Sequence, residues 1–155
     1  MVAEGLIKGH ILITGGTGFI GGYLSNRLRN AGYRVTTVSR SVGDNDRHIC
    51  ADLTNQETLV DLAKRLSSVD TIIHCAAIAH GEKPPENHSV AGFNTLIVNN
   101  ILKAFDQHQI RWIFISSISV YGELHSESLI PLIQSPKPAD SYGTGKLRDE
   151  VLFIS

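Results

Sequence analysis

The chain has 155 residues, with 14 Lys and Arg against 15 Asp and Glu and a formal net charge of −1. This length suits one domain that buries roughly 70% of its unfolded surface, and the balanced charge gives no reason to expect nucleic acid or an anionic membrane as a partner. With no apolar run near the roughly 18 residues of a membrane span, a start too polar for a secretory signal and only two cysteines, the sequence predicts a cytoplasmic globular domain.

Five short apolar runs, partly β-branched, predict strands. They read HILIT from His10, RVTTVS from Arg34, RHIC from Arg47, TIIHCA from Thr71 and WIFISS from Trp112. Runs of this kind are typical of strands that are buried on both faces of a parallel sheet.

Three apolar stripes between these runs have the spacing of helices. They comprise Ile20, Tyr23, Leu24, Leu28 and Ala31; then Leu59, Leu62, Ala63 and Leu66; and finally Phe93, Leu96, Ile97, Ile101, Ala104, Phe105 and His108. Strands that alternate with helices predict right-handed βαβ units. We therefore expect an α/β fold built on a doubly wound parallel sheet of about five strands.

A glycine-rich turn connects the first predicted strand to the first predicted helix. Gly15, Gly18 and Gly21 form the pattern G-x-x-G-x-x-G, in which one glycine can adopt a positive φ, one lets the backbone approach a pyrophosphate, and one lets helix and strand pack closely. The helix N-terminus adds unpaired N–H groups and a positive dipole end, and the Gly-Lys-Ser/Thr of a P-loop is missing. A glycine-rich turn without a ligand is the alternative, but its place in a βαβ unit favours a bound dinucleotide.

The end of the second predicted strand bears on which dinucleotide is bound. NAD enzymes often place an acidic residue here for the ribose hydroxyls, whereas this chain has Ser39 and Arg40. A guanidinium suits a 2′-phosphate, so NADP is slightly favoured over NAD; a surface arginine without a ligand is the alternative. Further on, Asp52 either accepts a hydrogen bond from the adenine amino group or marks the start of a helix, for which Thr54 or Asn55 is the better cap.

A second cluster of polar residues lies late in the chain. Tyr142 and Lys146 are four residues apart, so their side chains share one face of a helix. A lysine ammonium beside a phenol favours the phenolate, which yields a base for a sugar hydroxyl, and Ser117 could hold the same oxygen; an amphipathic surface pair is the alternative. The histidines show no zinc-like spacing, so we expect no metal.

Together, these motifs resemble the N-terminal part of an extended short-chain dehydrogenase/reductase of the nucleotide-sugar epimerase/dehydratase branch. The pieces that carry the resemblance follow the family order over nearly the whole chain: TGGTGFIG, ADLTN, HCAA, NTLIVNNILKA, SSISVYG and YGTGK. The resemblance implies a Rossmann-type fold, NADP or NAD as cofactor, and a catalytic set of Ser117, Tyr142 and Lys146. With Arg40 added from its charge, the expected cofactor-binding residues are Gly15, Thr17, Gly18, Phe19, Ile20, Gly21, Arg40, Asp52, Leu53, Ala76, Ala77, Tyr142 and Lys146.

Some positions depart from the family pattern. In the 4,6-dehydratases, the stretch that this part of the chain resembles reads Thr-Asp-Glu before Val-Tyr-Gly. This chain has Ser117, Ile118 and Ser119 there, so the acid pair that eliminates water is missing and dehydration is disfavoured. Gly143 and Gly145 cost about 1 kcal/mol each in a helix interior. We expect them to admit close approach of the cofactor or of a neighbouring helix.

The resemblance implies a nucleotide-sugar epimerase or a 4-keto-sugar reductase of polysaccharide biosynthesis, which transfers a hydride at sugar C4 with Tyr142 as acid and base. The alternative is a non-catalytic NAD(P)-binding module without its substrate region. We expect one NAD(P)-binding domain over residues 1–155, truncated at its C-terminus, because family members continue with more strands and with the region that holds the nucleotide sugar. The predicted strand from Trp112 then lies at an exposed sheet edge, which favours self-association, for example as a homodimer.

Overall fold

The structure is a computed structural model that describes residues 8–43, 45–79, 82–106, 109–123 and 134–154. The chain divides into two compact units. The first unit holds Met1–Ala77 and Asn100–Ile115, and the second unit holds Ile78–Asn99 and Ser116–Ser155. His108, at the end of the third predicted helical stripe, lies outside the described residues. The single domain over residues 1–155 stays a prediction.

A parallel five-stranded sheet forms the centre of the first unit, in the order β3-β2-β1-β4-β5. Ile13 of the central strand pairs in register with Thr37 on one side and with Ile73 on the other, and Leu12 and Ile72 are fully buried. The number of strands and their parallel arrangement confirm the sequence prediction. The strands are β1 (His10–Thr14), β2 (Arg34–Ser39), β3 (His48–Cys50), β4 (Thr71–His74) and β5 (Arg111–Phe114).

Three of the strands are shorter than the predicted runs: β3 lacks Arg47 at its start, and the runs from Thr71 and Trp112 end earlier than predicted. The strand that begins at Thr71 ends at His74. Two residues later, the Ala76 N–H donates to the Thr14 side-chain hydroxyl at 3.1 Å and not to a backbone carbonyl of a neighbouring strand. The strand predicted from Trp112 ends at Phe114. It is the outer strand of the described sheet, and Ile113 is 41% exposed there, so the predicted sheet edge is confirmed.

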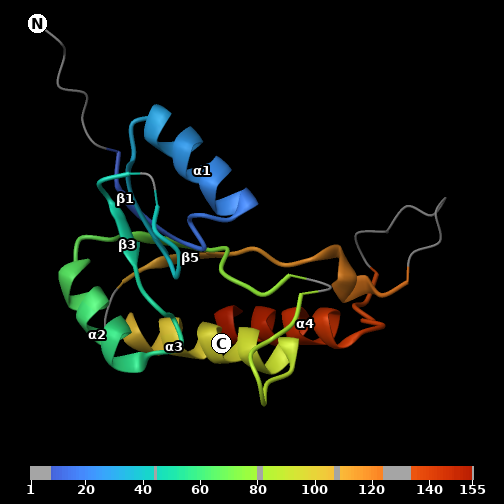
Figure 1. Ribbon diagram of the computed structural model, residues 1–155. Coiled ribbons are helices and arrows are strands. Elements are labelled where there is room, and N and C mark those ends of the chain that lie inside the picture. The colour runs from blue at the N-terminus through green and yellow to red at the C-terminus, as the bar shows by residue number, and fades with distance from the viewer. Residues whose placement is uncertain (1–7, 44, 80–81, 107–108, 124–133, 155) are drawn as a thin grey trace, which may run out of the picture. The chain divides into compact units, whose positions relative to one another are not determined.

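Helices pack on both faces of this sheet, which makes the fold a doubly wound, Rossmann-type α/β fold. Figure 1 shows α1 (Phe19–Asn30) and α2 (Gln56–Arg65) on opposite sides of the strands. Helix α2 begins after Asn55, whose side-chain oxygen accepts the Thr58 N–H at 3.0 Å, so of the two candidate caps, Thr54 and Asn55, the structure has Asn55. The residues of α3 (Val90–Ala104) from Asn100 onward also belong to this unit.

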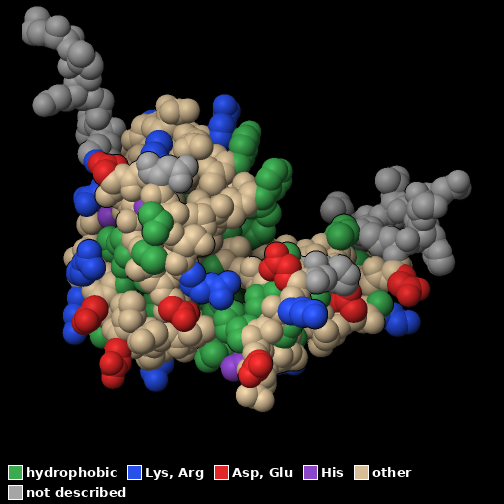
Figure 2. All heavy atoms as spheres, viewed as in Figure 1, with side chains coloured by type: hydrophobic (Ala, Val, Ile, Leu, Met, Phe, Trp, Pro, Cys, Tyr) green, Lys and Arg blue, Asp and Glu red, His purple; other side chains and the backbone are tan. Residues whose placement is uncertain are grey.

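The apolar stripe predicted for α1 is only partly buried. Leu24 and Leu28 pack against the core of the sheet, but Ile20 and Tyr23 are 46% and 64% exposed, and Figure 2 shows apolar side chains on the surface over this helix. The reason is that α1 lies closest to the turn at Gly21, which is buried. The buried face is therefore centred on Gly21, and the positions beside it turn outward.

The second unit is built from the first ten residues of α3, the short 3₁₀ helix η1 (Ile118–Tyr121) and α4 (Ser141–Ile154). The side chain of Asn94 fixes the segment that leads into this unit, because it bonds both the N–H and the carbonyl of Ile78, at 2.8 and 3.0 Å. One side-chain amide thus satisfies both backbone polar groups of a buried residue.

A histidine is buried at the start of β1. The ring of His10 is 4% exposed and bonds the hydroxyls of Ser68 and Thr36 at 2.8 and 2.9 Å. Burial, with a further contribution from the Arg34 charge, lowers the pKa of His10 from its ordinary value of 6.5. The folded state therefore takes up this proton less readily than the unfolded chain does.

We expect the free energy of unfolding to fall as the pH is lowered below about 6.5, because the unfolded chain then binds the proton that folded His10 resists. In urea denaturation between pH 7.5 and 5, wild type should lose more stability than His10→Gln, whose amide can still form a hydrogen bond. His88→Gln, at an exposed loop position, is the control and should follow wild type. Parallel curves for wild type and His10→Gln would contradict the argument.

A carboxyl group is buried within the second unit. Asp149 is 1% exposed, its Oδ1 accepts the Thr95 hydroxyl at 2.6 Å, and Oδ2 has no hydrogen-bond partner among the described residues. Burial raises the pKa of Asp149 from its ordinary value of 3.8, although the Thr95 bond and the Lys146 charge act in the opposite direction.

A carboxyl whose pKa is raised in the folded state stabilises the fold below its unfolded pKa and loses that contribution as the pH rises. We expect Asp149→Asn to gain stability relative to wild type as the pH rises from about 4, measured by thermal unfolding at a series of pH values. Asp61→Asn, at a side chain that is 77% exposed, is the matched control. A stability difference between Asp149→Asn and wild type that does not change with pH would refute this explanation.

Candidate functional site

The glycine turn between β1 and α1 is the most tightly defined backbone feature of the first unit. Gly15 has a φ of +69°, and its N–H donates to the Val38 carbonyl at 2.8 Å. A Cβ on Gly15 would lie 2.9 Å from the Ala76 nitrogen, and a Cβ on Gly21 would overlap the Gly15 carbonyl. Two of the three predicted glycines are therefore required by the close packing of turn, strand and helix.

Gly18 has a different role, since its environment is open. It is the N-cap of α1, no side chain caps the helix there, and the first turn contains no acidic residue. A Cβ on Gly18 would meet only the Gly15 carbonyl, at 3.2 Å, and Phe19 is 96% exposed. The helix N-terminus therefore presents N–H groups and the positive end of its dipole to an anion without competition from a side chain. The turn fits the pyrophosphate of a dinucleotide.

The segment after β4 lies beside this turn. The Thr14 hydroxyl bonds Nδ1 of His74 at 3.0 Å and accepts the Ala76 N–H. Ala76 is thereby held against Gly15, and Ala77 follows it, half-buried. The two alanines predicted from the sequence to line the cofactor thus start next to the glycine turn.

The end of β2 is tied to the same turn by hydroxyl groups. The Thr17 hydroxyl donates to Ser39 Oγ at 3.0 Å, and Ser39 donates to the Ser41 carbonyl at 3.0 Å. His48 also bonds the Ser41 carbonyl through Nε2, at 2.9 Å. From the sequence, Ser39 stood out only as the residue in place of an acid, and His48 was not among the candidate site residues. Hydroxyl residues at a strand end, followed by a histidine on the next strand, were the available signal.

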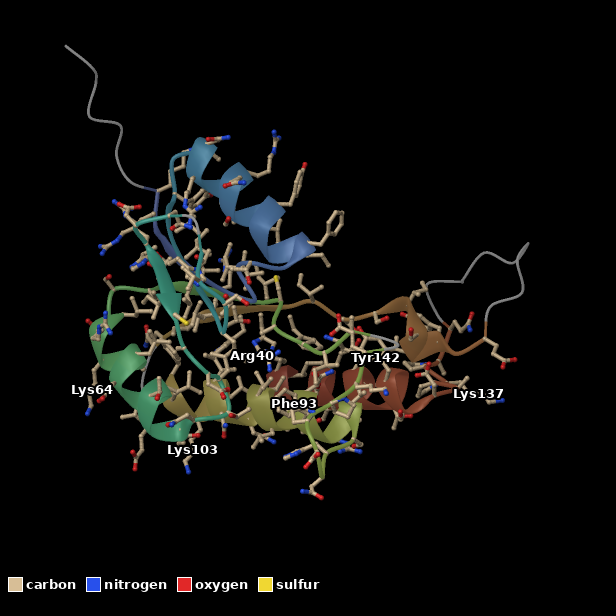
Figure 3. All side chains as sticks on the ribbon, in the orientation of Figure 1. Arg40, Lys64, Phe93, Lys103, Lys137 and Tyr142 are labelled. Carbon is tan, nitrogen blue, oxygen red and sulfur yellow. The ribbon has the colours of Figure 1, made fainter. Side chains whose placement is uncertain are left out.

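Arg40 follows Ser39 and is exposed; Figure 3 labels it. Lys64 and Asp61 form an ion pair. Arg40 forms none with any carboxylate in the described part of the chain. Its charge is therefore available to a ligand. The role of Arg40 toward the 2′-phosphate of NADP stays a prediction.

Asp52 is engaged within its own turn. Its Oδ1 accepts both the N–H and the hydroxyl of Thr54, at 2.9 and 2.8 Å, while Asn55 caps the helix. This pattern supports the interpretation of Asp52 as part of the helix start. The carboxylate is exposed, and its role toward adenine stays a prediction. Leu53 is buried, with 4% exposure.

The second unit brings the three predicted catalytic residues onto two packed elements. Ser117 is the N-cap of η1, and its hydroxyl accepts the Ser119 N–H at 3.2 Å. Tyr142 and Lys146 lie one turn apart on α4, and Figure 3 labels Tyr142 near the start of this helix. The two elements touch where a Cβ on Gly143 would overlap the Ser119 carbonyl.

The start of α4 is fixed by polar and steric contacts. The Asp140 carboxylate accepts the Gly143 N–H at 2.7 Å, which satisfies one open donor of the first turn. A Cβ on Gly145 would lie 2.8 Å from the Ala91 Cβ of α3. For both glycines the close neighbour is therefore protein: η1 for Gly143 and α3 for Gly145.

Lys146 is buried, with 6% exposure, and precedes the buried Asp149 by one turn. The neighbouring Glu150 accepts a hydrogen bond from the Ser116 hydroxyl. Ser117 is half-buried at the cap of η1, and its hydroxyl is engaged as well, because it donates to Ser119 Oγ at 3.1 Å. The choice of Ser117 over Ser116 therefore stays a prediction, and the contact between Ser116 and Glu150 was not foreseen from the sequence.

No group of three or more His, Cys, Asp and Glu side chains is arranged to hold a metal ion within residues 8–154 as far as they are described. None of the described helices is long and apolar enough to cross a membrane.

Comparison with known proteins identifies the family of this chain. The profile of the NAD dependent epimerase/dehydratase family matches residues 11–153. A probable UDP-arabinose 4-epimerase 3 of Oryza sativa subsp. japonica is 30% identical over 169 residues, which cover 94% of this chain and 40% of that protein. The chain thus spans less than half the length of this relative.

Solved structures give the same picture. MoeE5, in complex with UDP-glucose and NAD, superposes with a TM-score of 0.75 at 31% identity, over 94% of this chain and 48% of that one. The UDP-glucose 4-epimerase of Thermus thermophilus, in complex with NAD, has a TM-score of 0.81 at 23% identity, over 94% and 50%, and supports the fold alone. The family profile extends over nearly the whole chain, and the glycine turn and the Tyr142/Lys146 helix both lie inside the matched range, so the chain belongs to the NAD-dependent epimerase/dehydratase family.

Proposed function

We propose that this chain is the cofactor-binding part of an NAD(P)-dependent nucleotide-sugar epimerase or 4-keto-sugar reductase. The observation that carries the proposal is the packing of the Tyr142/Lys146 helix on the serine turn η1, in a chain that also has an uncapped, acid-free helix N-terminus after a glycine turn. The first feature suits proton transfer at a hydroxyl, and the second suits a dinucleotide pyrophosphate.

The cofactor would be held by residues of the first unit. The turn from Thr14 to Gly21 would hold the pyrophosphate, because its helix N-terminus is open to anions. Ala76 and Ala77 would line the cofactor, and Asp52 and Leu53 would lie at the adenine. When bound, the nicotinamide would supply the hydride acceptor or donor for sugar C4.

The acid and base would come from the second unit. Tyr142 takes the proton of the substrate hydroxyl, or returns it to the ketone, and the Lys146 ammonium stabilises the phenolate form. Lys146 is suited to this because it is buried on the same face of α4 as Tyr142. Ser117 holds the reacting oxygen by a hydrogen bond from its hydroxyl.

The choice between NADP and NAD depends on Arg40. Its exposed guanidinium has no described carboxylate partner, and a serine stands where NAD enzymes often have an acid. Both features favour NADP slightly. The two solved structures compared above are complexes with NAD, so NAD stays the alternative.

The substrate class is a nucleotide sugar, by analogy with the UDP-glucose in the MoeE5 complex. Because the acid pair of the dehydratases is missing, epimerisation or reduction is favoured over elimination of water. A cofactor-binding module without turnover is the second candidate, since the chain covers 40% to 50% of the relatives compared above. Self-association through the exposed edge of β5 also belongs to this proposal.

Gly18 offers a test of the cofactor site that leaves the fold in place. We expect Gly18→Asp to weaken NADH binding at least tenfold, measured by fluorescence titration, because a carboxylate at the helix N-terminus would repel the pyrophosphate while still capping the helix. Gly18→Ser forms the same kind of cap without the charge and meets the same Gly15 carbonyl, so it should retain most of the affinity. Equal NADH affinities for the two variants would argue against a pyrophosphate at this turn.

Tyr142 offers a test of the chemistry. With NADP or NAD and a UDP-hexose, Tyr142→Phe should lower the rate of appearance of reduced nicotinamide by about 10² to 10⁴-fold, the usual contribution of a general acid–base group. Tyr121→Phe is the control, since Tyr121 lies on η1 in the same unit and has no assigned proton to transfer. Turnover that survives Tyr142→Phe sinks the assignment of the base; cofactor binding without turnover in wild type supports the second candidate.

A further inference from the structure

A pocket of about 290 Å³ lies in the first unit, on the α1 side of the β2 end, near the lower limit of small-ligand pockets. One wall comes from α1, with Ser25, Asn26 and Arg29, and the other from Asn45 and His48. Thr17 of the glycine turn lines it as well. Of the residues that line this pocket, the proposed function uses only Gly16 and Thr17 of the glycine turn.

The electrostatics of the pocket are set by Arg29. Its guanidinium donates to the Asn45 side-chain oxygen at 3.1 Å and makes longer contacts with Ser25 Oγ and the Val35 carbonyl, at 3.4 and 3.5 Å. All three acceptors are neutral, and no carboxylate pairs with Arg29 in the described part of the chain. Asp44, next to Asn45 in sequence, lies outside the described residues. A guanidinium has five N–H donors, so it has capacity for an anion.

The opposite wall is held in place by hydrogen bonds within the protein. Nε2 of His48 bonds the Ser41 carbonyl at 2.9 Å, and because a carbonyl can only accept, this nitrogen carries a proton. Nδ1 bonds the Thr37 hydroxyl at 2.8 Å. Both ring nitrogens are thus engaged within the protein. His48 shapes the wall and leaves recognition of a ligand to the donors on α1.

The location of the pocket indicates which anion it fits. It begins at Thr17, whose hydroxyl bonds Ser39 at the point where dinucleotide-binding proteins contact the adenosine ribose. None of the described lining residues is acidic. A pocket whose described lining offers an arginine fork and an amide, and no acid, suits a phosphate group.

We propose that this pocket binds a phosphate group, with the Arg29 guanidinium as its counter-charge and the Asn26 amide as a second donor. Two sources share this chemistry. One is the 2′-phosphate of NADP, and in that form the inference rests on the proposed function. The other is free inorganic phosphate.

Arg29→Gln tests the counter-charge, with Arg27→Gln on the same helix as the matched control, since Arg27 is exposed and does not line the pocket. The affinities of the whole chain for inorganic phosphate, NADP and NAD are measured by calorimetry. We expect Arg29→Gln to weaken phosphate binding about tenfold or more and Arg27→Gln to leave it unchanged. If NADP also loses its advantage over NAD, the source is the 2′-phosphate; if NADP and NAD bind alike in all three proteins, it is free phosphate.

Arg29→Gln also removes the hydrogen bond from Arg29 to Asn45, and this loss alone could weaken phosphate binding. A second pair of variants therefore changes the charge of the pocket and keeps Arg29. Asn26→Asp adds a carboxylate to the pocket and keeps Arg29, whereas Asn30→Asp adds the same charge to α1 outside the lining. We expect Asn26→Asp to weaken phosphate binding and Asn30→Asp to leave it unchanged.

Wild type that binds NAD but shows neither phosphate binding nor an NADP advantage overturns this inference and leaves the proposed function intact. Loss of the NADP advantage through Arg40→Gln, with Arg29→Gln unchanged from wild type, also overturns it. Phosphate binding without affinity for NAD or NADP overturns the proposed function and leaves the free-phosphate form standing.

Discussion

The close approach of α1 to the glycine turn is the contact on which the first unit depends. Gly21 lies so near the Gly15 carbonyl that a Cβ at that position would overlap it. This approach sets the rotation of α1, so that Leu24 and Leu28 face the sheet and the apolar residues near the helix start face outward. It also ends the strand-to-helix turn with an uncapped N-terminus. The anion site and the packing of the helix therefore have the same cause.

The second unit uses glycine in the same way, but inside a helix. Successive residues of α4 are about 100° apart around the axis, so Gly143 and Gly145 flank the face that carries Tyr142 and Lys146. Each glycine costs about 1 kcal/mol of helix stability, and each lets a neighbour approach: η1 at Gly143 and α3 at Gly145. The two glycines thus let α4 pack closely against η1 on one side of the Tyr142 and Lys146 face and against α3 on the other.

The sequence was sufficient where one physical pattern determines the outcome. Apolar, partly β-branched runs predicted all five described strands, and Asn55 was one of the two candidate caps, with Thr54, because its side-chain oxygen can reach an open N–H. The rotation of α1 was not predictable from its apolar stripe, because the position of Gly21 against the turn overrides the pattern. The pairing of Ser116 with Glu150 was also out of reach, since it joins residues 34 positions apart. His48 was missed because its partners, the Thr37 hydroxyl of β2 and the Ser41 carbonyl of the loop after it, come together only when β2 and β3 pair.

Hydroxyl groups at the strand ends explain how this edge of the sheet remains suited to anions. Backbone N–H groups beyond the last paired residue of a parallel strand need acceptors, and carboxylates could serve. Here Thr14 accepts the Ala76 N–H, and Ser39 links Thr17 to the Ser41 carbonyl. The carboxylate of Asp52, which follows β3, is turned to Thr54. Because neutral oxygens satisfy the backbone and the nearby acid is engaged in its own turn, the positive end of α1 meets little competing negative charge. Either kind of acceptor would satisfy the backbone, but only hydroxyls do so without adding negative charge beside the helix N-terminus, which is the condition for phosphate binding there.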